Sequence, residues 1–325
     1  MRARFAHILR QAYSPAWRAH QASAANQFHN FCSTFGLPLR PITATAVGMW
    51  IAGQLELGKK ASSVATDVSA LRTWCRVRFV PFLPTEDDEF VVAQALRGAR
   101  ADEDRPVRRP AAITVTMLHR LAQVVNWRDP HEHQLFVQAL VSHDAMLRAG
   151  TTCGNKLRTE HVTVEADGSV RLELHKTKTT RLQADPSPVW LVPAASPANS
   201  HLDAARMLVR YMDRSGVSLY EDAPLFAKLA SDGRVRIPFG HQTYRNWSAR
   251  LRALCLRAGI TAYVTPHALR AGGITDSVMG GVAVDVARRV GGWAHSKSTD
   301  SYIRAGKAAA SKVRQAFSAQ LTSSQ

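Results

Sequence analysis

The stretch 265–302 constrains the chain most, because it combines helical spacing with residue types that suit chemistry on a phosphate group. His267 and Arg270 lie three residues apart, so on a helix they share one face. A helical stretch follows, with valines at every fourth position (Val282, Val286 and Val290). This part of the chain therefore predicts helical structure that presents a histidine and an arginine together.

Two glycines, Gly291 and Gly292, predict the end of that helical stretch. Trp293 follows directly, and Tyr302 lies nine residues further on. A tyrosine hydroxyl is a poor nucleophile toward phosphate unless cations surround it, and here cations are close in the sequence. Each of these residues alone has an ordinary structural role, so it is their joint order that indicates a reactive site.

The HALRAGG segment at 267–273, the Gly-Gly-Trp and the later tyrosine resemble the C-terminal motif of the tyrosine recombinases, the phage-integrase family. The residues of this segment are most similar to those of the branch found in tyrosine-recombinase retrotransposons and some integrases. The resemblance implies a mainly α fold with a small antiparallel β-sheet, arranged as a two-domain, C-shaped DNA clamp. It also implies catalytic roles for His267, Arg270, Trp293 and Tyr302.

The charge balance agrees with a nucleic-acid partner. The 325 residues include 42 Lys and Arg against 25 Asp and Glu, a formal net charge of +17. This basic excess predicts binding to a polyanion, double-stranded DNA first. No apolar run reaches the roughly 18 residues of a membrane span, and the basic start lacks the apolar core of a signal peptide. We therefore expect an intracellular protein located with DNA, without a membrane partner.

Cysteine spacing gives no sign of a metal or disulfide framework. The four cysteines are scattered widely and form no CxxC pair. We expect buried, reduced thiols. The residues concerned are Cys32, Cys75, Cys153 and Cys255.

Residues 1–100 predict a bundle of four or five helices, because apolar residues recur at helical spacing between stops such as Gly36 and Gly58. By the resemblance, this region is the core-binding, SAM-like domain that precedes the catalytic domain. Its basic residues favour phosphate contacts, although a solvated helix face is the commoner role for any single one. The residues expected to contact DNA here are Lys59, Lys60, Arg72 and Arg76.

The segment 101–111 is charged and contains two prolines, which predicts an extended linker. Its Arg105, Arg108 and Arg109 are expected either to lie along DNA or to be solvated. The catalytic domain then occupies 112–325. It ends in a helix that, by the resemblance, docks on a neighbouring protomer, although packing within its own subunit is equally compatible with the sequence.

The catalytic domain includes a predicted helix over 131–148. The LRAG segment at its end resembles the first-arginine box of the family, which makes Arg148 the first catalytic arginine and Arg158 the alternative. The family usually has an acidic residue shortly after that arginine, and here Thr151 or Thr152 occupies the place. This departure keeps open a DNA-binding relic with a decayed active site.

Strand-like segments at 161–164, 170–175 and 189–192 predict the small sheet. Between the second and third lies HKTKTTR, and the resemblance implies a catalytic lysine on a β-hairpin turn there. Lys178 fits that role best and Lys176 fits nearly as well, the other being a DNA contact.

A basic amphipathic helix is predicted over 241–258. Its arginines, Arg245 among them, are expected to face outward. Such a face is able to enter a DNA groove, although a solvated face is the more frequent outcome.

The resemblance implies that Tyr302 attacks a DNA phosphodiester and forms a 3′-phosphotyrosyl link, with no metal, cofactor or ATP. It also implies a homo-oligomer on DNA, a tetramer in the synaptic complex. An alternative keeps cleavage without strand exchange, as in a type IB topoisomerase-like enzyme or a resolvase. The resemblance assigns the charge and proton roles to four residues, Arg148, Lys178, His267 and Arg270. Trp293 would donate its indole N–H to a phosphate oxygen and pack the site.

Overall fold

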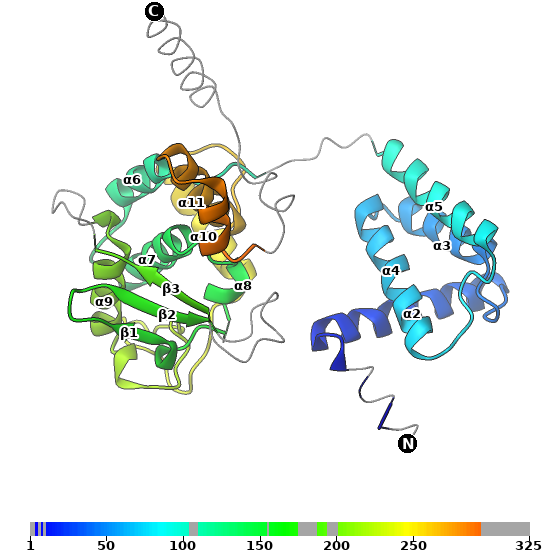
Figure 1. The fold of residues 1–325 in the computed structure, drawn as a ribbon, viewed down its shortest axis with the longest axis horizontal. Coiled ribbons are helices and arrows are strands. Elements are labelled where there is room, and N and C mark those ends of the chain that lie inside the picture. Colours follow the sequence, from blue (N-terminus) through cyan, green and yellow to red (C-terminus); the bar gives the residue numbers. More distant parts are fainter. Residues whose placement is uncertain are drawn as a thin grey trace, which may run out of the picture. The chain divides into compact units, whose positions relative to one another are not determined.

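The computed structural model describes residues 4–5, 8, 11–103, 110–154, 156–174, 187–193 and 201–293. The chain divides into two compact units, Met1–Val107 and Arg108–Gln325. In its described part the first unit is helical, and the second combines helices with a three-stranded antiparallel sheet (Figure 1). The predicted fold class, mainly α with a small antiparallel sheet, is confirmed. No helix in these ranges is long and apolar enough to cross a membrane.

The helices of the first unit begin and end at local sequence signals. The Ser14 hydroxyl accepts a hydrogen bond from the Trp17 amide at 3.2 Å and caps α2. Thr85 and Asp88 form a capping box at the start of α5. Asp88 also accepts the Ala44 amide at 2.9 Å, which ties the start of α3 to α5. The helices are α2 (Pro15–Phe35), α3 (Ala44–Glu56), α4 (Ala61–Val77) and α5 (Glu86–Ala101).

A buried carboxylate joins α2 to α4 in this unit. Asp67, on α4, is 3% exposed and lies 3.2 Å from the Nε2 of His20 on α2. Its other oxygen forms an ion pair with the Lys59 ammonium, which also donates to the Gln54 side-chain oxygen at 2.7 Å. Lys59 is therefore engaged inside the unit, because a buried carboxylate needs a compensating cation.

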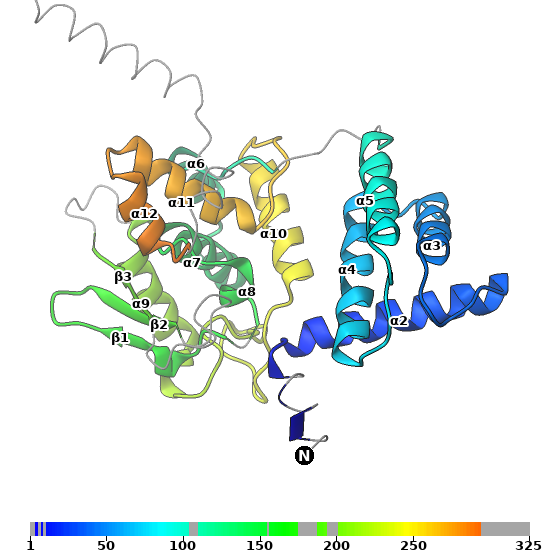
Figure 2. The ribbon, with the colours of Figure 1, turned by 45° about the vertical axis from the view of Figure 1, so that its right-hand side comes forward.

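Helix α7 lies in the middle of the second unit, between the sheet and the helices α10 and α11 (Figures 1 and 2). It is buried along most of its length, with Leu135, Phe136 and Leu140 in the main core. The helices of this unit are α6 (Val115–Val124), α7 (Pro130–Asp144), α8 (Ala149–Thr152), α9 (Ala204–Ser215), α10 (Tyr244–Arg257), α11 (His267–Met279) and α12 (Val284–Val290), with 3₁₀ turns η1 (Thr159–His161) and η3 (Val217–Leu219).

The sheet has the order β1-β2-β3, with both pairs antiparallel. Val170 on the central strand faces Val164 on one side and Leu191 on the other. Its apolar side chains alternate, so one face packs into the same core as α9. The strands lie where the sequence pattern predicts them. They are β1 (Val162–Val164), β2 (Val170–Leu174) and β3 (Ser187–Leu191).

The predicted helix over 131–148 is wrong at its end. Helix α7 stops at Asp144, and Met146 adopts a left-handed backbone with φ of +46°. The Leu147 amide closes this turn by donating to the Ser142 carbonyl at 3.0 Å. This conformation is usual for glycine and rare for a residue with a long side chain. Because a methionine occupies the position, the sequence contains no signal that the helix ends here.

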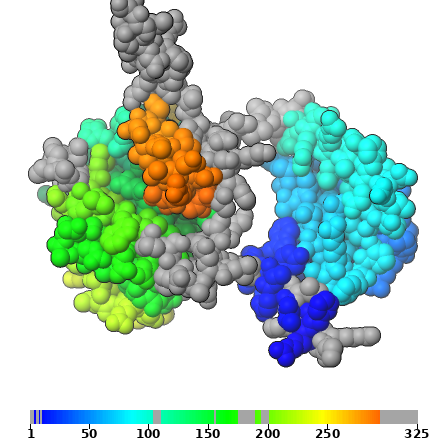
Figure 3. Space-filling model, viewed as in Figure 1, coloured from blue at the N-terminus to red at the C-terminus, as the bar shows by residue number. Residues whose placement is uncertain are grey.

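Helix α12 buries a different side from the one its valines indicate. Val282, Val286 and Val290 are 41%, 47% and 52% exposed, whereas Ala287 is 1% exposed. Figure 3 shows this segment, in orange, at the surface of the second unit. The small side chain of Ala287 lets the helix pack closely, and the valines remain outside.

The four cysteines are buried and unpaired, as predicted. Burial raises the pKa of Cys75 and of Cys255 to about 11, and it also raises the pKa of Cys32 and of Cys153. Such thiols stay protonated and unreactive at neutral pH.

Two glycines allow α11 to contact its neighbours through main-chain atoms. A Cβ on Gly272 would lie 1.6 Å from the Ile113 carbonyl oxygen, and one on Gly273 would lie 2.1 Å from the His143 carbonyl oxygen. Neither position has room for a side chain. The AGG part of the HALRAGG segment is therefore explained by packing.

We expect Gly272→Ala to destabilise the second unit, because its methyl group collides with a main-chain carbonyl that cannot turn aside. The loss should lie at or beyond the upper end of the ~1–3 kcal/mol typical of overpacking, measured by urea unfolding. Gly150→Ala is the matched control, since a Cβ there meets nothing within 4 Å. Equal midpoints for the two variants would contradict the close approach.

Candidate active site

Helix α11 carries two of the predicted catalytic residues in its first turn. His267 is its first residue and is half-buried, and Arg270, three residues on, is only 3% exposed. The segment before α6 holds this turn in place, because the Ile113 amide donates to the Ala268 carbonyl at 3.0 Å. The two side chains are thus presented by a helix whose start is anchored to another part of the chain.

Arg148 approaches the same imidazole from the turn between α7 and α8. Burial and the positive charges of Arg270 and Arg148 lower the pKa of His267 below its ordinary value of 6.5. The fold therefore brings both guanidinium groups close enough to act on His267. The imidazole is neutral at pH 7 and able to accept a proton.

Arg270 is held on two sides. Its Nη1 donates to the Met146 carbonyl, and its Cζ lies 3.6 Å from the ring centroid of Trp293. A guanidinium over an indole face gains a cation–π interaction. These contacts define the orientation of a buried cation.

Trp293 packs beneath this arginine in a small separate core. It is 8% exposed and lies with Met146, Ile274 and Ala287. A glycine two residues earlier is required for this position, because a Cβ on Gly291 would lie 1.8 Å from the indole ring. The Gly-Gly-Trp segment therefore turns the indole back under α11.

Met146 is a site residue that no sequence motif singles out. Its left-handed backbone leads from α7 into the Arg148 turn, and its carbonyl accepts from Arg270. Residues in this region of conformational space are held there by their surroundings at a cost of about 1–3 kcal/mol. The only signal in the sequence was its place next to the LRAG segment.

Thr151 and Thr152 stand where the family usually has an acidic residue after the first arginine, and their hydrogen-bond partners are neutral. The Thr152 hydroxyl lies 3.1 Å from the Ser142 hydroxyl, and the Thr152 carbonyl accepts from the Gln138 side chain at 3.0 Å. All three residues are buried. Helix α8 is therefore joined to α7 by neutral polar groups, and the Thr151 amide closes the turn onto the Arg148 carbonyl at 2.7 Å.

Arg158, the alternative first arginine, has other partners. Its guanidinium lies 3.3 Å from a Glu160 oxygen and 3.4 Å from an Asp222 oxygen, and it also donates to the Asp222 carbonyl. It is not among the charges that act on the pKa of His267. Arg148 is among those charges.

The predicted DNA contacts differ in how available their charges are. Lys60, Arg76 and Arg245 are exposed. Lys59 is engaged with Asp67, and Arg72 forms an ion pair with Glu89.

The expectation that the arginines of α10 face outward is wrong for Arg250. Its guanidinium donates to the His131 carbonyl at 2.6 Å and is half-buried. Arg257 is exposed but pairs with Glu132 at the start of α7. These arginines bind α10 to α7, a role that helical periodicity does not distinguish from a solvated face.

Several predicted site residues lie outside the described ranges. They are Arg105, Arg108, Arg109, Lys176, Lys178 and Tyr302. Within the described ranges, no group of His, Cys, Asp and Glu is arranged to hold a metal ion.

The chain resembles solved structures over nearly its whole length. A structure of a λ integrase dimer bound to a COC′ core site has a TM-score of 0.59 and 17% identity, and the similarity covers 93% of each chain. The chain has the tyrosine-recombinase fold. The predicted resemblance is thereby confirmed at the level of fold.

Two further structures agree. The XerH site-specific recombinase bound to a difH substrate has a TM-score of 0.59 and 14% identity, covering 90% of this chain and 76% of that one. The Tn1549 transposon integrase with transposon right-end DNA has a TM-score of 0.55 and 12% identity, covering 86% of each chain. No protein-family model and no curated protein matches the sequence.

We expect Arg148→Gln to raise the pKa of His267 toward 6.5, because a positive charge that disfavours the imidazolium is removed. The titration is measured by NMR of histidine-labelled protein, with the His267 signal assigned through His267→Gln. The exposed Arg245→Gln serves as the control and should leave this pKa unchanged. Equal responses to both variants would place Arg148 away from His267.

Proposed function

We propose that this chain is a site-specific DNA recombinase or integrase that cuts and rejoins double-stranded DNA through a 3′-phosphotyrosyl intermediate. The observation that supports the proposal is that Arg148, distant in sequence, acts on the same imidazole as Arg270: both charges lower the pKa of His267. The tyrosine-recombinase fold supports it, since the similar λ integrase, XerH and Tn1549 integrase structures contain DNA.

In the proposed reaction the Tyr302 oxygen attacks the scissile phosphorus, and the bond from phosphorus to the 5′-oxygen breaks. His267, neutral at pH 7, takes up the tyrosine proton. Lys178, with Lys176 as the alternative, protonates the leaving 5′-oxygen. The phosphotyrosyl ester retains the energy of the broken bond, so a second 5′-hydroxyl reverses the step on another strand without ATP.

Arg148 and Arg270 stabilise the negative charge that develops on the non-bridging oxygens. A planar guanidinium is able to bind two of these oxygens at once. Arg270 is already oriented by the Met146 carbonyl and the Trp293 ring, so little reorganisation is needed when the phosphate arrives. Trp293 supports the arginine from below and donates its indole N–H to a phosphate oxygen in the proposed complex.

The proposed partner is duplex DNA, bound inside the cell by a homotetramer at the moment of exchange. The net charge of +17 supports a salt-dependent association with phosphates. The exposed Lys60, Arg76 and Arg245 are the described residues that we assign to backbone contacts. These contacts position the protein, and base contacts or DNA shape supply the choice of site.

Covalent trapping tests the proposal directly. The protein is mixed with labelled DNA from the flanks of its own gene, nicked so that the released end diffuses away. We expect a denaturant-resistant protein–DNA adduct from the wild type and none from Tyr302→Phe, which should still bind DNA. Tyr263→Phe, which also removes a single phenolic hydroxyl, is the matched control and should form the adduct.

The other outcomes are equally informative. An adduct that persists in Tyr302→Phe would reject this tyrosine as the nucleophile. Salt-sensitive binding without any adduct, together with no relaxation of supercoiled plasmid, would indicate a DNA-binding protein with an inactive site. Relaxation without strand exchange would indicate a topoisomerase-like activity.

The lysine pair at 59 and 60 tests the assignment of phosphate contacts. We expect Lys60→Gln to lower the slope of log K against log salt by about 0.9, the effect of one lost phosphate contact. Lys59→Gln should leave the slope unchanged and lower the thermal midpoint of the first unit, because its ammonium pairs with the buried Asp67. A reduced slope for Lys59→Gln alone would reverse the assignment.

A further inference from the structure

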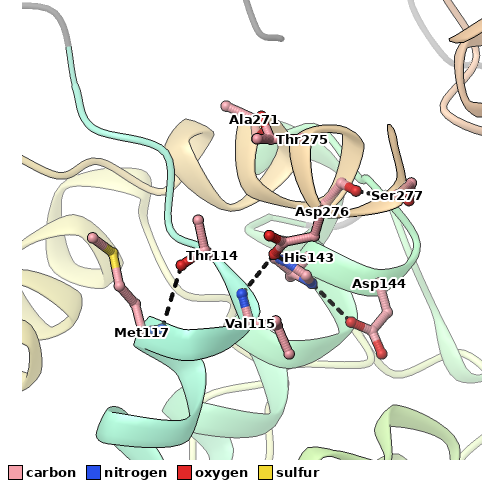
Figure 4. Close-up of polar contacts among 10 residues, drawn as sticks. Thr114, Val115, Met117, His143, Asp144, Ala271, Thr275, Asp276 and Ser277 are labelled. Carbon is pink, nitrogen blue, oxygen red and sulfur yellow. Dashed lines mark hydrogen bonds and ion pairs between the residues drawn. The ribbon is translucent and has the colours of Figure 1, made fainter. Parts of the chain in front are cut away.

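His143 is a buried titratable residue to which the proposed reaction gives no role. It lies in the last turn of α7 and is 5% exposed. Its Nδ1 lies 2.8 Å from an Asp144 oxygen, and its Nε2 lies 2.9 Å from an Asp276 oxygen (Figure 4). An ionised carboxylate only accepts hydrogen bonds, so with both aspartates ionised both ring nitrogens donate. This geometry fits the imidazolium form.

Asp276 connects three helices at this point. It belongs to the third turn of α11, and its Oδ2 faces both the His143 ring on α7 and the Val115 amide, the first of α6, at 2.5 Å (Figure 4). The first amides of a helix have no partner within the helix, so this carboxylate also satisfies the start of α6. One side chain thereby fixes α11 to two neighbouring helices.

The closest contacts around this point are between main chains. Gly272 and Gly273 meet the carbonyl groups of Ile113 and His143, and a Cβ on each would also lie 3.1 Å from a side-chain atom, His143 Cδ2 for Gly272 and Met146 Cγ for Gly273. Glycine allows this close approach but adds no polar side-chain contact of its own. The ion pair of His143 and Asp276 supplies a directional contact at the same place.

A second attachment of α11 lies at its other end. Arg270 donates to the Met146 carbonyl, three residues beyond His143 on the same stretch of chain. Arg270 and Asp276 are six residues apart, about 9 Å along a helix axis. Two attachments separated by this distance define both the position and the tilt of α11 against the segment that leads into Arg148.

We propose that His143, held as an imidazolium between Asp144 and Asp276, is a positioning residue that fixes α11 against α7 so that His267 and Arg270 face Arg148. The consequence for catalysis rests on the proposed function. The positioning itself does not, because it concerns the geometry of the free protein.

The charges around His143 agree with this role. Burial lowers its pKa, but the hydrogen bonds and charges of Asp144 and Asp276 together raise it to about 9. Asp144 is the charged group from α7 and Asp276 the one from α11, and α6 contributes the Val115 amide through Asp276. A folded pKa above 6.5 means that the stabilisation is complete below pH 6.5 and is lost as the pH rises through about 9.

The test uses the full chain and the titration of His267 as a reporter, because the pKa of His267 depends on its distance from Arg148 and Arg270. In His143→Gln and Asp276→Asn we expect that pKa to move toward 6.5. Asp285→Asn is the matched control, since it removes an exposed carboxylate from the adjacent α12, where Asp285 pairs with Arg288 at 3.1 Å. The control should titrate as the wild type does.

A purely stabilising contact predicts a different result. If both variants unfold at lower temperature while His267 titrates as in the wild type, the positioning role is overturned. If the variants fail to fold, the His143 signals of the wild type decide. Titration near 9 supports the imidazolium bridge, and titration at or below 6.5 refutes it.

Adduct formation by the same proteins separates this inference from the proposed function. If His143 has the positioning role, the two variants form adduct about tenfold to a hundredfold more slowly than the wild type, as expected for a small misplacement of catalytic groups. The slope of log K against log salt for DNA binding stays unchanged. A wild type without adduct whose His267 responds to Asp276→Asn would reject the function and keep the positioning. Normal adduct rates and an unresponsive His267 would reject the positioning and keep the function.

Discussion

The contact between the main chains of α7 and α11 is the constraint on which the site depends. Gly272 and Gly273 allow α11 to lie against the carbonyls of His143 and Ile113. A larger residue at either position would push the helix away and carry His267 and Arg270 with it. The residues to which we assign catalysis therefore depend on the glycines that allow close approach, because His267 and Arg270 shortly precede Gly272 and Gly273 on one helix.

Close packing alone would bring cationic side chains together without defining their orientation. In the second unit each buried cation has specific partners: a carbonyl and an indole face for Arg270, and carboxylates for His143. Arg148 is left half-buried beside a neutral imidazole. Arg270 is thus buried with a defined orientation, which is the preorganisation on which the proposed reaction relies.

Local signals predicted much of this architecture. Caps such as Ser14 and Thr85 begin helices through contacts with the residue three positions further on, so they depend on nearby sequence alone. The spacing of His267 and Arg270 likewise predicted a shared helix face. The sheet followed from short alternating apolar segments.

The rest depended on contacts between distant residues. The end of α7 was misplaced because Met146 adopts a backbone conformation that its residue type does not announce. The ion pair of Asp67 with Lys59, which lies just before α4, and the ion pair of His143 with Asp276 form only in the folded unit. Charge patterns in the sequence could not distinguish these engaged side chains from exposed ones, because both kinds lie on or beside amphipathic helices.

The buried thiols have a practical consequence. Cys32 and Cys75 lie in the core of the first unit, and Cys153 and Cys255 lie in that of the second. A maleimide or disulfide reagent therefore reaches each pair only when its own unit opens. The native chain thus carries two internal reporters of local unfolding, and a cysteine introduced at an exposed position would be labelled selectively without replacing any of them.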